Sequence, residues 1–480
     1  MRIVLFALCG SYSHTCLAIR CLRGPLVEAG HEVFLVEGNL RDRSSGLLKE
    51  LYKYKADVYS FSCYIWNIEE TVKLAGNLHT LLPESRIILG GPEVSYNSES
   101  YSGLDFVDTV ICGAGELVLP LVCDRIEKGE KLDSVYRSKD ILLNDGILYE
   151  ENEIKGKGKS LLYYESSRGC PFSCSYCLSS AEQGVKAKSV EQTLDELLDF
   201  ERIKEDFKIV KFVDRTFNFD IRRANEIWKG LLSDKYTKKY HFEICASLLN
   251  EESFDILQMM PKGKIQLEVG LQSTNEETLR EISRHLDAKK TLENCKRIKE
   301  MGNIHIHLDL IAGLPFEDFS SFGRSFDEAY RCCHQLQLGF LKLLHGTGLR
   351  KNADRYGYKY LANPPYTVLM SKWISYEEMY KLEKISFLLE RYHESGNFDK
   401  CLTYLLGKLS SPFDFYCGFS DFIEKKDGRE IQKISQADAF SLLFAYGSSL
   451  LGEKKDIERF SDLMHEDFSR KEVRKMPKLK

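Results

Sequence analysis

Three cysteines, Cys170, Cys174 and Cys177, constrain this chain more than any other feature of its sequence. Their C-x3-C-x2-C spacing lets one tight loop place three thiolates at three corners of a [4Fe–4S] cube, whereas ferredoxin-type sites supply a fourth cysteine. The next cysteine, Cys245, lies far along the chain. One iron is therefore expected to lack a protein ligand, and the amino and carboxylate groups of S-adenosylmethionine (SAM) suit such an open iron.

Two other interpretations of the triad stay open at this point. A zinc loop would need a fourth Cys or His nearby, and the closest histidines, His79 and His241, are distant in sequence. In a chain with 15 cysteines the spacing also arises occasionally by chance.

The run from Arg168 to Cys177 resembles the cluster loop of the radical SAM superfamily. Tyr176 stands just before the third cysteine, where that family carries an aromatic residue near the adenine of SAM. The resemblance implies that Cys170, Cys174 and Cys177 hold the cluster and that electron transfer from it cleaves SAM to a 5′-deoxyadenosyl radical. It assigns no catalytic side chain beyond these cofactor ligands.

Size and composition bound the rest of the interpretation. A chain of 480 residues is too long for one core and predicts two or three domains. A net charge of −5 gives no electrostatic reason to expect nucleic acid or an anionic membrane. The N-terminal apolar run, residues 2–8, is far short of a membrane span and lacks the flanks of a signal peptide. Scattered cysteines without a framework spacing predict reduced thiols and a cytoplasmic protein.

The first 120 residues alternate strand-like and helix-like stretches, which predicts a doubly wound parallel sheet. Residues 16–29 are expected to be helical despite Gly24 and Pro25. Strands are expected at residues 2–8, 31–36, 57–62, 86–89 and 107–111. Four strands run directly into turns of small or polar residues, which in such a sheet share the C-terminal edge where ligands bind. A nicotinamide or flavin site would need G-x-G-x-x-G after the first strand, and Gly10 alone does not supply it.

These turns resemble the loops of the cobalamin-binding domain that precedes the radical domain in one large class of radical SAM enzymes. The glycines would let the corrin edge and nucleotide tail approach the backbone. The chain lacks the D-x-H-x-x-G motif by which methionine-synthase-like domains supply a histidine to cobalt. The alternative is an empty Rossmann-like domain used only for packing. The cobalamin contacts that the resemblance implies are Ser11, Tyr12, Ser13, His14, Ser62, Cys63, Tyr64, Trp66, Gly90, Gly91, Pro92, Glu93, Val94, Gly113, Gly115 and Glu116.

Six more strand candidates, separated by amphipathic helices, form the middle of the chain. They are residues 161–165, 209–213, 242–246, 265–269, 305–311 and 338–344. Six βα units fit the open (β/α)6 partial barrel of the superfamily, whereas a full TIM barrel would have eight.

Several strand ends in this barrel resemble the superfamily's SAM contacts. Asp214 stands where the family contacts the methionyl amino group, although the chain has Val-Asp-Arg in place of the commoner Gly-Gly-Glu. Arg215 could bind a carboxylate of SAM or of the substrate. For any single acid among these residues, the alternative role is that of a helix cap or of a solvated ion pair. The other contacts implied are Glu243 near the ribose and methionyl region, Gln272 and Ser273 at the ribose and carboxylate, and Ile311 to Gly313 against the adenine.

The C-terminal residues predict further helices, one of them capped by Ser375, and end in a basic tail at residues 470–480. The aromatic run at residues 413–419 is either core or a wall of a substrate cavity. The expected domains are 1–137 (cobalamin-binding), 138–160 (hairpin and linker), 161–350 (partial barrel) and 351–480 (helical).

The resemblance covers roughly residues 1–350 and implies a cobalamin-dependent radical SAM enzyme. Its expected reaction is methylation of an unactivated carbon of a small molecule, with one SAM methylating cobalamin and a second yielding the radical. An external electron donor such as flavodoxin or ferredoxin is expected. Radical cyclisation or rearrangement is the second enzymatic possibility, and a non-catalytic cobalamin or iron–sulfur sensor is the alternative from another class.

Overall fold

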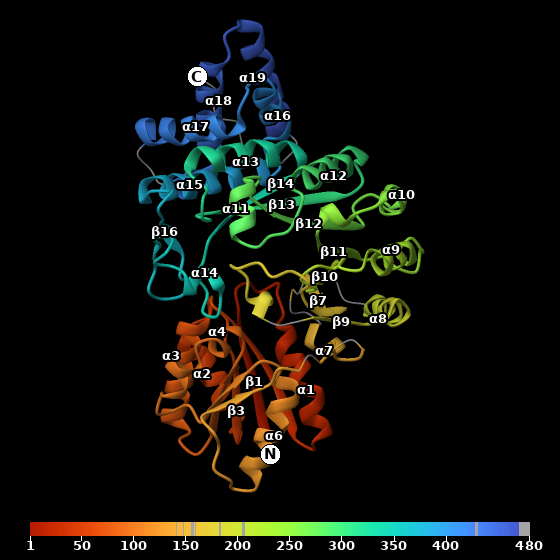
Figure 1. Cartoon of the computed structure of the whole chain (residues 1–480), viewed down its shortest axis with the longest axis vertical. Helices are drawn as coiled ribbons and strands as arrows, with labels where there is room; N and C mark the ends of the chain where they lie inside the picture. The colour runs from red at the N-terminus through yellow and green to blue at the C-terminus, as the bar shows by residue number, and fades with distance from the viewer. Residues whose placement is uncertain are drawn as a thin grey trace. The chain divides into compact units, whose positions relative to one another are not determined.

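The computed structural model describes residues 1–140, 142–146, 148–154, 158, 160–181, 184–203, 207–427 and 431–469. Two six-stranded sheets are followed by a helical region (Figure 1). This confirms the predicted fold class. The chain also divides into two compact units, of which unit 1 comprises Met1–Leu267, Lys342–Ala353 and Leu361–Thr367. Unit 2 comprises Glu268–Leu341, Asp354–Tyr360 and Val368–Lys480.

The first sheet is parallel throughout and has the strand order β2-β1-β3-β4-β5-β6. Because β2 and β3 lie on opposite sides of β1, the order reverses there, and ligands bind at such a switch point in open α/β sheets. The sixth strand was not predicted, because it has only three residues. The strands are β1 (Arg2–Cys9), β2 (Glu32–Asn39), β3 (Val58–Ser62), β4 (Arg86–Gly90), β5 (Thr109–Cys112) and β6 (Val135–Arg137).

Helices cover both faces of this sheet, as the unbroken apolar run of β1 requires. The face that carries Val4 and Phe6 packs against α2 and α3, and the face that carries Ile3 and Leu5 packs against α1 and α6 (Figure 1). Helix α1 continues through Pro25 as predicted. The helices are α1 (Leu17–Glu28), α2 (Ser44–Tyr52), α3 (Ile68–Leu81), α4 (Pro92–Ser95), α5 (Ser98–Ser102) and α6 (Gly115–Glu127).

The second sheet has the order β14-β13-β12-β11-β10-β7, which supplies the six expected strands. In β12 and β13 buried residues alternate with half-buried ones, so one face packs on helices while the other carries polar side chains such as Glu268 and Asp309. The strands are β7 (Leu161–Tyr164), β10 (Ile209–Phe212), β11 (Lys239–Ile244), β12 (Ile265–Gln272), β13 (His305–Ala312) and β14 (Gln335–Phe340). The helices are α8 (Val190–Arg202), α9 (Ile221–Gly230), α10 (Glu251–Met259), α11 (Glu276–Glu281), α12 (Ala288–Met301) and α13 (Phe319–Cys332).

Two strands of this sheet begin earlier than predicted. β11 starts at Lys239 because this residue pairs with Ile209 on β10. β14 ends at Phe340, and the apolar residues beyond it leave the sheet, since Leu343 N donates to Tyr366 O at 3.1 Å. The prediction from apolar composition, residues 338–344, therefore placed the last strand too far toward the C-terminus.

The connection between the sheets differs from the expected hairpin. Among the described residues of 138–160 the only regular element is the four-residue helix α7 (Glu151–Ile154). Buried Arg20 holds it through an ion pair with Glu153 at 3.1 Å. The hairpin prediction was wrong because this segment takes its order from side-chain contacts with α1.

The C-terminal residues are helical, as predicted. Ser375 caps α15 in a capping box with Glu378. The aromatic run lies in α17, where Tyr416 and Phe419 are fully buried, so these rings are core. The basic tail lies outside the described residues. The helices are α15 (Tyr376–Leu388), α16 (Asp399–Gly407), α17 (Pro412–Asp427), α18 (Gln436–Leu450) and α19 (Lys454–Ser469).

No helix in the described part of the chain is long and apolar enough to cross a membrane.

The turn after β5 yields a prediction, because Gly113 has φ +86° and a Cβ built there would lie 2.1 Å from Ser138 O. Gly113→Ala should cost the strain of a positive φ, about 1 kcal/mol, plus roughly 1–3 kcal/mol for the clash. Gly129→Ala is the matched control, since Gly129 has φ +66° but open space around it. Thermal unfolding should show a clearly larger drop in Tm for Gly113→Ala, and equal drops would contradict the close approach.

Candidate functional site

The cysteine loop begins directly after the short strand β8 (Ser167–Gly169), which pairs with β9 (Val185–Ala187). Cys174 is buried, whereas Cys170 and Cys177 are half-buried, and none of the three forms a disulfide bond. Cys177 N donates to Cys174 O at 3.1 Å, which closes a tight turn. Cys170 Sγ lies 3.7 Å from Thr216 Oγ1 on the segment that follows β10. The loop thus offers three thiols on one short stretch of chain.

The donor set fits a cluster better than a single metal ion. Within the described ranges no three side chains of His, Cys, Asp or Glu converge as ligands of one ion. A structural zinc ion needs four such ligands. A [4Fe–4S] cube takes its ligands at separate corners, and three cysteines leave its fourth iron open. The residues present therefore suit a cluster with one exchangeable position.

Asp214 is fully buried and holds the chain just before the cysteine loop. Its carboxylate accepts hydrogen bonds from Ser166 N at 2.8 Å, Ser166 Oγ at 2.5 Å and Ser167 Oγ at 2.6 Å. Burial raises the pKa of Asp214, and these hydrogen bonds oppose the rise. The expected contact of Asp214 with the SAM amino group stays a prediction, but both oxygens already have donors. The two serines were not identified from the sequence.

Arg215 differs sharply from the neighbouring aspartate, because its side chain is exposed. Among the described residues its guanidinium makes no hydrogen bond or ion pair. Burial raises the pKa of half-buried Tyr64 and the charge of Arg215 lowers it, so the guanidinium lies within electrostatic range of the turn after β3. Thr216, the next residue, is the one beside Cys170 Sγ. A bound carboxylate at Arg215 would therefore lie close to the cysteine loop.

The remaining expected SAM contacts divide between the units. Unit 1 holds Tyr176 and Glu243, and Glu243 pairs with Lys211 at 3.9 Å. Unit 2 holds the positions at the ends of β12 and β13. There Gln272 has φ +72° and Gly313 has φ +89°, while Ile311 is half-buried.

Ser273 is buried in unit 2 and donates its hydroxyl to Glu317, a residue that the sequence analysis did not identify. The Ser273 Oγ–Glu317 Oε1 distance is 2.5 Å, and Ser325 Oγ donates to the same oxygen at 3.1 Å. Burial raises the pKa of Glu317 to about 7, against the effect of these two hydrogen bonds. An acid two residues after a Gly-Leu-Pro turn was the available signal.

The turns expected to contact cobalamin present exposed aromatic rings at the C-terminal edge of the first sheet. Tyr12 is 55% and Trp66 54% exposed, and Trp66 stacks on Tyr64 with ring centroids 4.4 Å apart. Single exposed rings are common on protein surfaces, but these two lie at the one edge of the sheet where ligands bind in such folds. They suit a flat, largely apolar ligand. His14 Nδ1 lies 3.3 Å from Tyr163 Oη on β7.

At two glycines of these turns the protein's own backbone leaves no room for a side chain. A Cβ at Gly91 would lie 2.5 Å from Cys63 O, and one at Gly113 would meet Ser138. The backbone of the protein itself, rather than a ligand, already requires glycine at both positions. The other expected contacts form the same turns: Ser11, Ser13, Ser62, Gly90, Pro92, Val94 and Gly115.

Two expected cobalamin contacts, Glu93 and Glu116, are buried and bind residues from later in the chain. Glu93 Oε1 accepts from Tyr366 Oη at 2.6 Å. Glu116 Oε1 accepts from Arg168 Nη1 at 2.8 Å. Neither Tyr366 nor Arg168 was identified as a site residue. Whether either glutamate also meets cobalamin stays a prediction.

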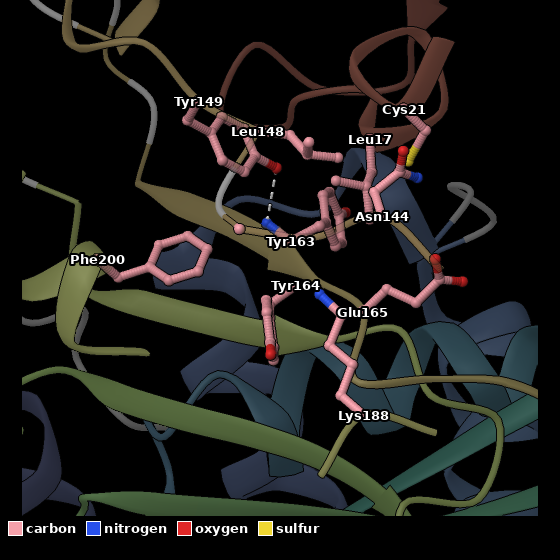
Figure 2. A pocket seen from close by; sticks show the side chains of 11 residues that line it. Leu17, Cys21, Asn144, Leu148, Tyr149, Tyr163, Tyr164, Glu165, Lys188 and Phe200 are labelled. Atoms are coloured by element: carbon pink, nitrogen blue, oxygen red, sulfur yellow. Dashed lines mark hydrogen bonds between the residues drawn. The ribbon is translucent and has the colours of Figure 1, made fainter. Parts of the chain in front are cut away.

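A small cavity of about 20 Å³ lies beside β7, between α1, the connection and α8 (Figure 2). Figure 2 shows Tyr149 reaching over it, with its hydroxyl accepting from Tyr163 N at 3.0 Å. Among the described residues Asn144 Nδ2 is buried there without a hydrogen-bond partner. The volume suits one water molecule and no metabolite. This cavity is therefore structural. It borders Glu165, which accepts a hydrogen bond from Arg168, a residue of β8 just before the cysteine loop.

Three family models match the chain. Residues 3–122 match the B12 binding domain, residues 164–329 the radical SAM superfamily, and residues 354–479 a protein of unknown function (DUF4080). The matches confirm the expected order of a cobalamin-binding domain and a radical SAM domain. These two domains take cobalamin, SAM and a [4Fe–4S] cluster as cofactors.

Several known proteins are similar to this chain. The hopanoid C-3 methylase of Methylococcus capsulatus is 23% identical over 320 residues, which are 62% of this chain and 60% of the methylase. The cobalamin-dependent radical SAM methyltransferase TokK of Streptomyces tokunonensis is 25% identical over 304 residues, 55% of this chain and 44% of TokK. The chain thus spans less than two thirds of either relative. The radical enzyme OxsB with aqua-cobalamin bound has the same fold, with a TM-score of 0.66 and 15% identity over 98% of this chain and 80% of OxsB.

Glu317 gives the site a testable pH dependence. Its pKa of about 7 lies above the usual value of 4.5. The protonated carboxyl is therefore favoured by folding, and its stabilising contribution, roughly 3 kcal/mol, is complete below pH 4.5 and lost as the pH rises through about 7. Glu317→Gln cannot titrate, so the Tm of the wild type should fall relative to this variant between pH 5 and pH 8.

Glu300→Gln on the exposed side of α12 is the matched control, and its Tm difference from the wild type should stay constant over the same range. A constant difference for Glu317→Gln as well would contradict a raised pKa at this position.

Proposed function

We propose that this protein, a cobalamin-dependent radical SAM enzyme by its domain order, is a methyltransferase that acts on an unactivated carbon of a small molecule. The observation that carries the proposal is the C-x3-C-x2-C loop, whose cysteines form no disulfide bond and which lies in the same compact unit as the first sheet with its exposed aromatic edge. The two relatives named as a methylase and a methyltransferase support methyl transfer.

In this proposal Cys170, Cys174 and Cys177 hold the cluster and leave one iron for SAM. When bound, the cluster supplies the electron that cleaves SAM to a 5′-deoxyadenosyl radical, and cobalamin carries the methyl group that the activated substrate carbon accepts. The protein places these groups and keeps water away from the radical. An external one-electron donor such as flavodoxin or ferredoxin reduces the cluster.

Different side chains are proposed to bind cobalamin and SAM. Tyr12 and Trp66 offer apolar rings for the cobalamin face, since both are more than half exposed. Arg215 offers a cation for a carboxylate beside the cysteine loop. Glu243, Gln272 and Ser273 are proposed to bind the polar part of SAM, and Ile311 to Gly313 its adenine. Abstraction of hydrogen by the radical needs no general base, so none is assigned.

Loss of one cluster ligand tests the radical chemistry. Cys174→Ala should abolish iron and sulfide binding and the formation of 5′-deoxyadenosine, because two thiolates hold the cube too weakly. Cys245→Ala is the matched control, as Cys245 is equally buried but lies outside the loop, where its Sγ is 3.3 Å from Ser247 Oγ. It should keep about four irons per chain.

Anaerobic incubation of the reconstituted protein with dithionite, SAM and cobalamin, followed by mass spectrometry, measures both SAM products. S-adenosylhomocysteine together with 5′-deoxyadenosine supports methyl transfer. 5′-Deoxyadenosine alone points to cyclisation or rearrangement instead. Neither product, from protein carrying both cofactors, would favour a sensor.

Arg215→Met tests the proposed carboxylate contact. A hydrogen-bonded charge pair is worth about 1.5–3 kcal/mol, so the Kd for SAM should rise roughly 10-fold or more. Arg222→Met, which removes an exposed arginine on α9, should leave SAM binding unchanged. Equilibrium binding of SAM to the reconstituted protein measures both. An unchanged Kd with Arg215→Met would remove Arg215 from the SAM site and leave a substrate carboxylate as its ligand.

A further inference from the structure

The two buried glutamates at the edge of the first sheet share one property. Glu116 accepts a hydrogen bond from Arg168, two residues before Cys170, and Glu93 accepts one from Tyr366, which is connected to the cysteine loop through residues 343–349. Glu93 is 5% and Glu116 7% exposed, so their carboxylates are withdrawn from solvent and need hydrogen-bond donors, which for Glu93 also include Tyr101 on α5. All residues involved lie in unit 1.

The Glu116 latch consists of Glu116, Arg168 and Glu165. Arg168 Nη1 donates to Glu116 at 2.8 Å, while Nε and Nη2 donate to the two oxygens of Glu165 at 2.9 and 2.7 Å. Such a forked pair fixes the plane of the guanidinium. Arg168 stands two residues before Cys170. The turn after β5 is thus bound to the first end of the cysteine loop.

The Glu93 latch consists of Glu93, Tyr366, Leu349 and Ser175. Tyr366 donates its hydroxyl to Glu93 at 2.6 Å, and its carbonyl accepts from Leu343 N at 3.1 Å. Leu349 belongs to the stretch Lys342–Ala353, as does Leu343, and its backbone N donates to Ser175 O at 3.0 Å. Ser175 lies between Cys174 and Cys177. The turn after β4 is thus bound to the middle of the cysteine loop.

The Glu93 latch is stiffened by its surroundings. The guanidinium carbon of Arg350 lies 4.6 Å from the Tyr366 ring centroid, and the His345 ring meets the same ring edge-on at 5.2 Å. A Cβ at Gly348 would lie 3.3 Å from Ser175 Cβ, so the stretch Lys342–Ala353 contacts the cysteine loop closely. A shift of the turn that carries Glu93 is therefore transmitted to Ser175 rather than absorbed.

We propose that Arg168 and Tyr366 are positioning residues that couple cobalamin binding to cluster binding, so that each cofactor raises the affinity of the protein for the other. The inference rests on the cofactors of the proposed function. Cobalamin settling on the turns after β4 and β5 fixes Glu93 and Glu116, and the two latches pass this order to the cysteine loop. Because coupling between two binding equilibria is reciprocal, the cluster must order the cobalamin turns by the same factor.

Cobalamin affinity, rather than turnover, measures this coupling. The Kd for hydroxocobalamin is determined anaerobically from its absorption spectrum, with the wild type carrying a reconstituted cluster and with the same protein stripped of iron by a chelator. The cluster should tighten binding by about 10-fold. Arg168→Met and Tyr366→Phe each disable one of the two latches, so each should reduce this ratio to roughly 3-fold.

Matched variants separate coupling from general damage. Arg125→Met removes an arginine of α6 that also has several acceptors, Glu130 and Asp133 among them, and Tyr59→Phe removes a buried hydroxyl that donates to Leu51 O. Both should keep the wild-type ratio. Arg168→Lys and Glu116→Gln serve if Arg168→Met does not fold, and both should lower the ratio. Combining Glu116→Gln with Arg168→Met should lower it no further than either change alone.

The reciprocal measurement is the rate at which a chelator removes iron, with and without cobalamin. Cobalamin should slow iron loss in the wild type, and by a smaller factor in Arg168→Met. A wild-type Kd that ignores the cluster, or an unchanged ratio in both Arg168→Met and Tyr366→Phe, would overturn the coupling. Coupling without 5′-deoxyadenosine or S-adenosylhomocysteine would leave it intact while the proposed function fails, and both products without coupling would do the reverse.

Discussion

A loop that binds a cluster through three cysteines has few side chains left to stabilise its own conformation, so it depends on contacts with the rest of the protein. Within the cysteine loop Cys177 N donates to Cys174 O, and other contacts come from outside it, such as Leu349 N donating to Ser175 O. The buried carboxylate of Asp214 fixes Ser166 and Ser167 ahead of it. Because a buried carboxylate is costly unless its oxygens have donors, these serines and the aspartate depend on one another.

The regular elements followed from the sequence because β1 is a continuous apolar run before a turn of small residues, whereas β13 alternates polar and apolar residues. β1 and β13 lie within a residue of their expected limits. Prediction failed where pairing, not composition, sets the limit, as at Lys239 in β11. It also failed in the connection, where a buried ion pair of Arg20 with Glu153 replaces a hairpin.

The cysteine triad could be predicted because its three residues lie within one short segment, at a spacing typical of a cluster loop. The partners of Glu93 and Glu116 could not, because Tyr366 stands 273 residues and Arg168 52 residues away from the carboxylate that each one holds. A strand-end glutamate in the sequence reads equally well as a ligand contact and as an anchor. Asp214 shows the same ambiguity, since its position matches a cofactor contact while its hydrogen bonds are those of a structural acid.

The composition of unit 1 from three separate stretches of chain has a consequence for synthesis. The first sheet is complete once residue 137 has been made, but the donor to Glu93 belongs to Leu361–Thr367. Domains begin to fold as they leave the ribosome, N-terminal parts first. Glu93 therefore lacks its bond from Tyr366 until the chain has grown 273 residues beyond it. The cysteine loop gains its contact with Leu349 only near the end of that interval, so iron delivered early meets a loop that is held at one end only.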